Sequence, residues 1–174
     1  MEGSMNKLMA ILMCVFIVQP TALVFAAGLG DTVKDVRAQY GAKVSLDETY
    51  YVFGKPPRVS RIDIESRKFI GAVPTVAEFV KSIKPLLPSD AKLTAARRKP
   101  APWPNGKVEI YSFKSAALAK LPNIKDAVID SPIGTFTAFL HFDGDQVVNG
   151  FVVMGLPGDV DLRGAKKISK NPFK

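Results

Sequence analysis

The strongest structural signal in the chain is the segment Thr135-Phe-Thr-Ala-Phe-Leu-His-Phe-Asp-Gly-Asp-Gln-Val-Val-Asn-Gly-Phe-Val-Val-Met154. Two runs rich in aromatic and β-branched residues, Thr135–Phe142 and Asp145–Met154, flank the pair Asp143-Gly144. Such a pair supplies the positive φ angles of a two-residue turn, so the segment predicts a β-hairpin. Apolar side chains fall on both faces of the first run, and this predicts a central strand. One face holds Phe136, Ala138, Leu140 and Phe142, and the other holds Thr135, Thr137, Phe139 and His141.

Three further segments carry strand signals, namely Thr49–Phe53, Val59–Glu65 and Lys107–Phe113. The first two are separated by Gly54-Lys55-Pro56-Pro57, which breaks the chain, and the third follows an Asn105-Gly106 turn. In the second segment, alternation directs Ile62 and Ile64 inward and the charged residues between them outward.

Two segments predict helices with the same kind of N-terminal cap. Thr32 is followed three residues later by Asp35, and Thr75 by Glu78, which is the spacing of a capping box. Apolar residues then recur at helical spacing and helix-ending residues follow. They are Val33, Val36 and Tyr40 before Gly41, and Val76, Phe79, Val80, Ile83 and Leu87 with Pro85 and Pro88. A short helix is also predicted at Ser115–Leu121, ended by Pro122.

These elements predict an α+β fold, with one or two helices packed on an antiparallel β-sheet. The likeness of Thr32–Val36 to Thr75–Phe79 adds the hypothesis of a duplicated helix-plus-strands unit. We expect one domain over residues 27–157. Lys99–Gly106 is rich in proline and predicts a loop, and residues 158–174 predict a basic, partly disordered tail.

Residues 1–26 predict a signal peptide. Lys7 precedes the unbroken apolar run Leu8–Val18, a helix breaker follows, and small residues end the segment, so export with cleavage after Ala26 or Ala27 is expected. The alternative is an uncleaved membrane anchor, although the run is shorter than the roughly 20 residues of a spanning helix. The only cysteine, Cys14, lies in this segment, so the mature chain has neither a disulfide nor a thiolate site.

The chain is basic, with 24 Lys and Arg against 16 Asp and Glu and a net charge of +8. Removal of the leader takes away one acid and one base, so the excess remains. It favours polyanionic partners, which outside the cytoplasm are lipid head groups, wall polymers and glycans. A nucleic-acid partner is not expected, since the chain carries no motif for one. The alternative is that the charge only keeps the protein soluble.

Residues suited to nucleophilic or metal-dependent catalysis are scarce. His141 is the only histidine, and no serine lies in a Gly-x-Ser-x-Gly motif. One histidine without cysteines predicts no zinc site, and the turn explains Asp143 and Asp145 without calcium. We therefore expect a protein that is not an enzyme and has no cofactor or metal.

The competing hypothesis is a secreted carboxylate-based hydrolase. It would use two of the acids on predicted strands, which are Glu48, Asp63, Glu65 and Glu109. A deep cleft containing two acids with perturbed pKa values would support it. The same acids are also explained as the charged, outward faces of strands, which need no chemistry.

The most suggestive cluster is Arg97-Arg98-Lys99, which runs into a proline-rich loop containing Trp103. Adjacent cations attract anionic groups, and the amphipathic Trp ring suits a sugar face or a lipid interface. We add Arg58 and Arg61, basic residues on predicted strands, to this candidate binding set. The alternative is a solvated connecting loop whose Trp103 folds back onto the domain.

The pattern Gly30-x-Thr32-x-x-x-Val36-x-x-x-Tyr40-Gly41 resembles two related groups of bacterial exported domains. One is the small lipoprotein subunit of the outer-membrane barrel-assembly machinery, and the other comprises domains shaped like the β-lactamase inhibitor protein. The resemblance implies an α+β fold and a role in binding proteins rather than in catalysis. The chain departs from the pattern because no lipidated cysteine follows the leader and Ala42 stands where a proline is expected, so no functional residue is transferred.

Together these observations predict an exported, non-enzymatic binding module of the bacterial envelope or exterior, either periplasmic or extracellular. Its expected ligand is a protein or an anionic envelope polymer or lipid surface. A structural partner subunit is a third hypothesis, which an exposed apolar patch and stable dimerisation would indicate.

Overall fold

The computed structural model describes residues 27–46, 52–128, 130–169 and 171–174. The predicted signal peptide, Glu48 and residues 49–51 of the predicted strand Thr49–Phe53 lie outside the described residues. Within the described ranges, no helix is both long and apolar enough to cross a bilayer.

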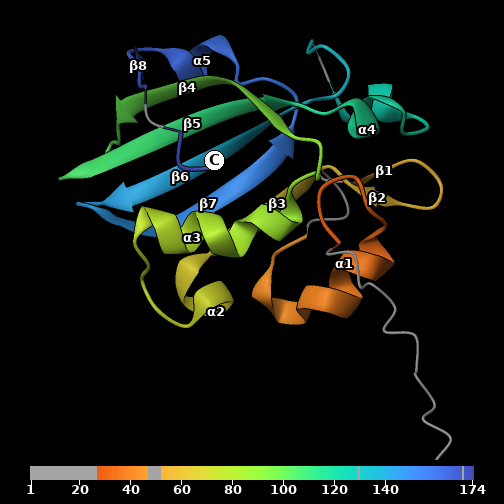
Figure 1. Cartoon of the computed structure of the whole chain (residues 1–174), viewed down its shortest axis with the longest axis horizontal. Coiled ribbons are helices and arrows are strands. Elements are labelled where there is room, and N and C mark those ends of the chain that lie inside the picture. The colour runs from red at the N-terminus through yellow and green to blue at the C-terminus, as the bar shows by residue number, and fades with distance from the viewer. Residues whose placement is uncertain (1–26, 47–51, 129, 170) are drawn as a thin grey trace, which may run out of the picture.

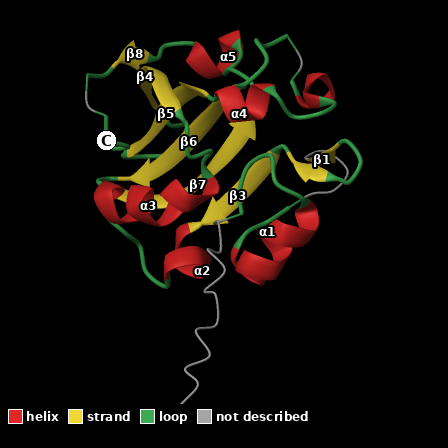
Figure 2. Cartoon of the chain, turned by 45° about the vertical axis from the view of Figure 1, so that its right-hand side comes forward, coloured by secondary structure: helices red, strands yellow, loops and turns green. Residues whose placement is uncertain are grey.

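In the described part of the chain, six antiparallel strands form the main sheet in the order β3-β7-β6-β5-β4-β8, and a separate hairpin joins β1 to β2 (Figure 1). Their bounds are β1 Val52–Phe53, β2 Arg58–Val59, β3 Arg61–Glu65, β4 Lys92–Pro100, β5 Gly106–Lys114, β6 Thr135–Asp143, β7 Gln146–Met154 and β8 Lys166–Lys167. Helices α1, α2 and α3 lie on one side of the main sheet and α5 on the other (Figure 2). The predicted α+β fold class is confirmed.

The helices are short. They comprise α1 Val33–Tyr40, α2 Ser66–Ile70, α3 Val76–Ile83, α4 Ala116–Ala119 and α5 Asp159–Leu162, with 3-10 turns η1 Gly41–Lys43, η2 Lys84–Leu86 and η3 Ile124–Ala127. Both predicted caps are present, since Thr32 Oγ1 accepts a hydrogen bond from the backbone N–H of Asp35 and Thr75 forms the capping box with Glu78. The short helix predicted near Ser115 is α4, and Ser115 caps it.

The predicted hairpin is formed by β6 and β7, and β6 is a central strand between β5 and β7. The predicted turn pair, Asp143-Gly144, is wrong by one residue, because Asp143 still pairs with Gln146 and the loop is Gly144-Asp145. Gly144 has a φ of 58° at the first loop position, where a type II′ turn requires a positive φ. A register shift between His141 and Phe142 interrupts the pairing close to this turn.

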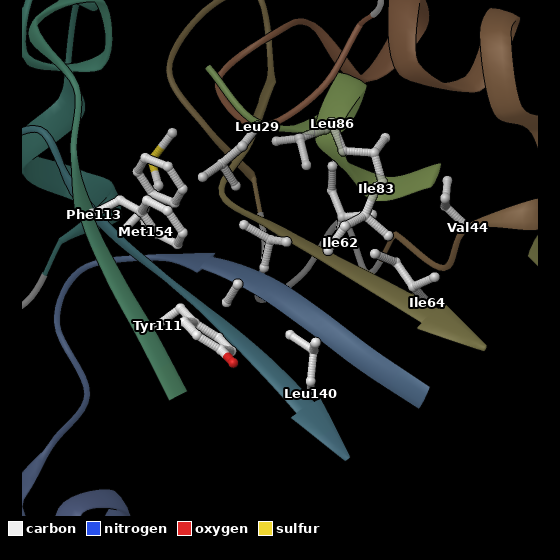
Figure 3. Close-up of a cluster of buried hydrophobic side chains, with 14 of the residues drawn as sticks. Leu29, Val44, Ile62, Ile64, Ile83, Leu86, Tyr111, Phe113, Leu140 and Met154 are labelled. Atoms are coloured by element: carbon white, nitrogen blue, oxygen red, sulfur yellow. The ribbon is translucent and has the colours of Figure 1, made fainter. Parts of the chain in front are cut away.

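The main hydrophobic core fills the space between the inner face of the sheet and the helices α1 and α3. The inner-face residues of β6 predicted from alternation are all buried in it, as are Ile62 and Ile64 of β3. Figure 3 shows Ile62, Ile64 and Leu140 gathered with Ile83 of α3 and Leu86 of η2. This core fixes the sheet's inner face toward the helices and leaves the opposite, outer face for other contacts.

A smaller cluster of Val108, Ile110 and Phe139 is buried on the outer face of the sheet. Trp103, Phe151 and Leu162 pack against it while remaining partly exposed. Because α5 is only four residues long, the outer face has a much thinner cover than the inner one.

Residues Val59–Glu65, predicted as one strand, divide at Ser60 into β2 and β3, which belong to different sheets. The backbone of Val59 pairs with Gly30 and Asp31, and the carbonyl of Ser60 accepts from Met154 N. Helix α2 was not predicted because five residues are too few for a helical pattern. The two capped helices precede different arrangements of strands, so the described residues do not form a duplicated unit.

Parts of the predicted loop Lys99–Gly106 and of the predicted tail, residues 158–174, belong to strands of the main sheet. Lys99 and Pro100, predicted as loop, are the last residues of β4, where β8 does not pair and a proline is tolerated. Residues from 158 on contribute α5 and β8, and the ring of Phe173 contacts Tyr111 and Phe113 at centroid distances of 5.0 and 5.1 Å. Short pairing and one aromatic anchor hold this segment, and neither gives a periodic pattern in the sequence.

Candidate functional site

The outer face of the main sheet presents side chains in rows that cross the strands. The pairing register places one row in the order Asp63, Phe151, Phe139, Ile110, Arg97 and Lys167. The next row is Glu65, Asn149, His141, Val108 and Lys99. Both rows therefore begin with an acid on β3, pass over an apolar centre and end with cations on β4 and β8.

We name Arg97, Lys99 and Lys167 the basic edge. Arg97 and Lys167 are cross-strand partners, so their side chains share one face of the sheet, and both residues are exposed. Among the described residues, no ion pair links these three cations to an acid. Like charges placed directly opposite each other destabilise a sheet. Folding alone therefore gains no stability from this exposed pair.

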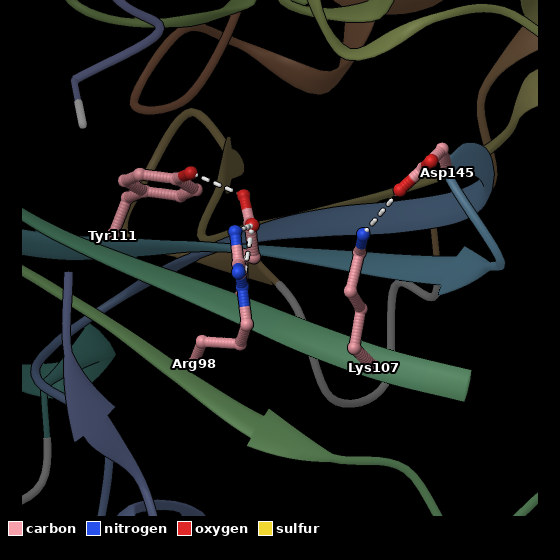
Figure 4. Close-up of polar contacts among 5 residues, drawn as sticks. Arg98, Lys107, Tyr111 and Asp145 are labelled. Carbon is pink, nitrogen blue, oxygen red and sulfur yellow. Dashed lines mark hydrogen bonds and ion pairs between the residues drawn. The ribbon is translucent and has the colours of Figure 1, made fainter. Parts of the chain in front are cut away.

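Arg98 does not belong to the basic edge, although it stands between two of its members. Strand alternation turns it to the inner face, where its Nε donates to Glu109 Oε1 at 2.9 Å and its Nη2 pairs with the same carboxylate (Figure 4). Glu109 is 4 % exposed, and its other oxygen accepts from the hydroxyl of Tyr111. Burial and this hydrogen bond raise the pKa of Tyr111. Arg98 therefore has an ion-pair partner within the protein, on the face of the sheet opposite Arg97.

Trp103 folds back onto the sheet, as the alternative interpretation of its loop proposed. Its Nε1 donates to the carbonyl of Phe142 at 3.1 Å, and the indole lies over Gly106, where a Cβ atom would come within 2.1 Å of Nε1. The ring is tilted beside the imidazole of His141 at 5.8 Å between centroids. It remains partly exposed, so an aromatic surface adjoins the second row near Lys99.

The other two predicted binding residues lie away from the basic edge. Arg58 is on β2, outside the main sheet, and its Nη1 donates to the carbonyl of Gly30 at 2.9 Å, next to the start of α1. Arg61 is on β3, at the opposite edge of the outer face, where it pairs with Asp63 at 2.8 Å and lies 4.0 Å above the ring centroid of Phe151. The structure therefore groups Arg97, Lys99 and Trp103, but not the whole predicted set.

A cavity of about 680 Å³ opens at the β3 edge of the outer face, and we name it the groove. Its lining includes Arg61, Asp63, His141, Asn149 and Phe151, together with residues 42–45, which follow α1. Ser45 and Asp63 exchange backbone hydrogen bonds of 3.0 and 3.2 Å, which closes this side. Sequence reasoning missed the groove, although alternation along the hairpin places the side chains of His141, Asn149 and Phe151 on one face.

His141 lines the groove and lies in the same cross-strand row as Lys99 of the basic edge. Its pKa is lowered, chiefly by burial and further by the positive charges of Lys99 and Arg61, while a hydrogen bond with Asn149 acts in the opposite direction. The imidazole is therefore neutral at neutral pH, when it can both donate and accept hydrogen bonds.

Because the folded protein disfavours the imidazolium, it binds fewer protons than the unfolded chain once the pH falls below the unfolded pKa of about 6.5. The contribution of neutral His141 to the free energy of unfolding is complete above that pH, and it is lost as the pH falls toward the lowered pKa of the folded state. We expect His141→Gln to show less loss of stability than the parent between about pH 7.5 and about pH 5, measured by urea unfolding. A variant with the same pH profile as the parent would contradict this assignment.

Two of the acids expected on outward faces, Asp63 and Glu65, do lie on the outer face and line the groove, where Asp63 pairs with Arg61 and Glu65 with Lys68. Glu109 faces the core instead, and Glu48 lies outside the described residues. A second cavity, of about 400 Å³, is lined by Glu109 and Asp145. Asp145 is exposed, and the hydrogen bond and charge of Lys107, 2.9 Å away, lower its pKa (Figure 4). Both carboxylates of this cavity therefore have cationic partners, Arg98 for Glu109 and Lys107 for Asp145.

An acid of the C-terminal segment, Asp161, also has a partner within the protein. Asp161 accepts a hydrogen bond from the backbone N–H of Gly158 at 3.1 Å and so caps α5. Across the ranges that the structure describes, no three His, Cys, Asp or Glu side chains form a group that could hold a metal ion.

Comparisons with protein-family models, with curated proteins and with solved structures give no match to this chain. The resemblance of Gly30–Gly41 to exported binding domains stays a prediction from the sequence. The function is therefore inferred from the geometry of the outer face.

Proposed function

We propose that the protein is an exported, non-enzymatic binding module of the bacterial envelope or exterior, and that its basic edge holds an anionic envelope polymer. One observation carries the proposal, namely the exposed cross-strand pair of Arg97 and Lys167, which no acid neutralises among the described residues. Export follows from the predicted leader and remains part of the proposal.

The spacing of the basic edge suits a linear polyanion. Cross-strand partners such as Arg97 and Lys167 have Cβ atoms about 5 Å apart, and alternate residues of one strand, such as Arg97 and Lys99, are about 7 Å apart. Three cations at this spacing attract successive anionic groups of one chain better than an isolated anion. The net charge of +8 adds a long-range attraction that salt weakens.

The first test replaces the cross-strand pair and measures affinity for linear polyphosphate by calorimetry at low and high salt. We expect Arg97→Gln/Lys167→Gln to weaken binding by about 2 kcal/mol, or about thirtyfold, at low salt, since each cation contributes about 1 kcal/mol near an anionic surface. Affinity of the parent should fall as salt rises.

Lys120→Gln/Lys125→Gln is the matched control, because it removes the same charge from exposed sites at and after the end of α4. It should retain nearly the parent affinity. Equal losses of polyphosphate affinity in both double variants would mean that only the net charge matters. That result would refute binding at the basic edge. Binding only to an envelope protein, with none to polyanions, would instead favour a protein partner.

A further inference from the structure

The basic edge and the groove occupy opposite margins of the outer face, and Trp103 and Leu162 of α5 pack on the apolar centre between them. The row that joins them runs from Asn149 and His141, which line the groove, across Val108 to Lys99. Trp103 stands beside this row, against His141. A ligand lying across the strands would therefore contact hydrogen-bonding groups at one end, an aromatic ring in the middle and cations at the other end.

The groove is built from polar groups that neighbouring side chains hold in place. The guanidinium of Arg61 is fixed between the carboxylate of Asp63 and the ring of Phe151, and that ring is stacked on Phe139 at 4.5 Å. The side chains of Arg61 and Asp63 keep 28 % and 31 % of their surface exposed. They can therefore still bond a ligand, and a preorganised site loses little entropy on binding.

The polar groups of the groove include both donors and acceptors. Asn149 supplies an amide, His141 an imidazole that is neutral at neutral pH, Asp63 a carboxylate and Arg61 a guanidinium. Vicinal hydroxyl groups match such a set because each hydroxyl both donates and accepts. A bare polyphosphate offers only acceptors, so it could not donate a hydrogen bond to the Asp63 carboxylate, which would keep Arg61 as its partner. The cavity of about 680 Å³ also has the size of a small-ligand site.

The distance between the two margins sets the length of the ligand. From β3 to β8 the sheet spans five strand spacings of about 4.8 Å each, or roughly 24 Å. A pyranose unit is about as long as one strand spacing, so about five sugar units would cross the face.

We propose that the ligand is an acidic polysaccharide, which crosses the outer face with hydroxyl groups in the groove and carboxylates on the basic edge. This inference rests on the proposed function, because it assigns the chemical class of the polymer held there. A polyuronate has this chemistry, since each of its sugar rings carries hydroxyl groups and one carboxylate.

The test titrates the purified protein with oligouronates of increasing length and with linear polyphosphate. Affinity for oligouronates should rise with length up to about five sugars and then level off. Asn149→Ala should weaken binding of the pentamer about tenfold, through loss of hydrogen bonds to the sugar, and should change polyphosphate affinity less than about twofold. Gln146→Ala, which removes an exposed amide on the same strand outside the groove, should change neither.

Three outcomes separate the two proposals. If polyphosphate binds through Arg97 but Asn149→Ala leaves oligouronate affinity unchanged, the polysaccharide is refuted and the basic edge stands. If uncharged oligosaccharides bind as tightly as oligouronates, the acidic class is refuted. If neither anion binds, or if Arg97→Gln affects neither, the proposed function fails and this inference fails with it.

Discussion

Arg98→Met is expected to lower the free energy of unfolding by about 2–3 kcal/mol at neutral pH, because it leaves the buried Glu109 carboxylate without its cation, and the Arg98 side chain is itself 45 % exposed. The carboxylate side chain is 5 % exposed, and only the hydroxyl of Tyr111 would remain as its hydrogen-bond partner. Urea unfolding followed by circular dichroism measures this change. The methionine keeps much of the aliphatic packing of the arginine, so the loss reports on the ion pair.

Arg97→Met is the matched control, because it removes the same charge from the adjacent residue on the opposite face. Its stability should be equal to that of the parent or slightly higher, since the repulsion between Arg97 and Lys167 is removed. Affinity for polyanions should show the reverse pattern, with a loss in Arg97→Met and little change in Arg98→Met. Equal stability of the two variants would contradict the stabilising ion pair between Arg98 and the buried Glu109.

Phe79→Ala is the second substitution with a large expected effect, a loss of about 3–5 kcal/mol. Phe79 has no exposed surface, and it anchors α3, an eight-residue helix too short to be stable without packing. The fit is close, because a Cβ atom at Gly150 of β7 would lie 3.2 Å from Phe79 Cζ. Thermal or urea unfolding measures the loss.

Lys81→Ala is the control for this helix, since Lys81 is exposed on α3. It should change the free energy of unfolding by less than about 0.5 kcal/mol. If Phe79→Ala were as stable as this control, the packing of α3 on the sheet would be wrong.

The local elements were predictable because their determinants are close in sequence. The threonine caps, with an acid three residues on, define both main helices, and the alternation of residues 135–142 defines a central strand. Buried Phe136 and Phe139 lie on opposite faces of β6, as alternation requires. These features depend on backbone geometry within a few residues.

The pairing of distant segments was not predictable in the same way. The strand β4 is interrupted by a register shift between Leu93 and Ala95, which breaks its alternating pattern, and β8 pairs through only two residues. Without β4 as a strand, nothing in the sequence placed Arg97 and Arg98 on opposite faces. The cationic cluster was therefore visible in the sequence, but its division between the two faces of β4 was not.

The groove combines residues from three separate parts of the chain, which explains why composition and spacing did not reveal it. The hairpin supplies His141, Asn149 and Phe151, while β3 and the segment after α1 supply the other walls. The hairpin residues share one face by alternation, so this part of the signal was present in the sequence. The remaining walls depend on where β3 joins the sheet.

The decisive measurement is a titration with linear polyphosphate that follows the side-chain Nε–Hε signals of Arg97 and Arg98 by NMR. These neighbours carry the same group on opposite faces of one strand. We expect the signal of Arg97 to shift in a saturable, salt-sensitive manner while that of Arg98 stays in place. A shift of Arg98 without Arg97, or equal movement of all arginine signals, would contradict binding at the basic edge.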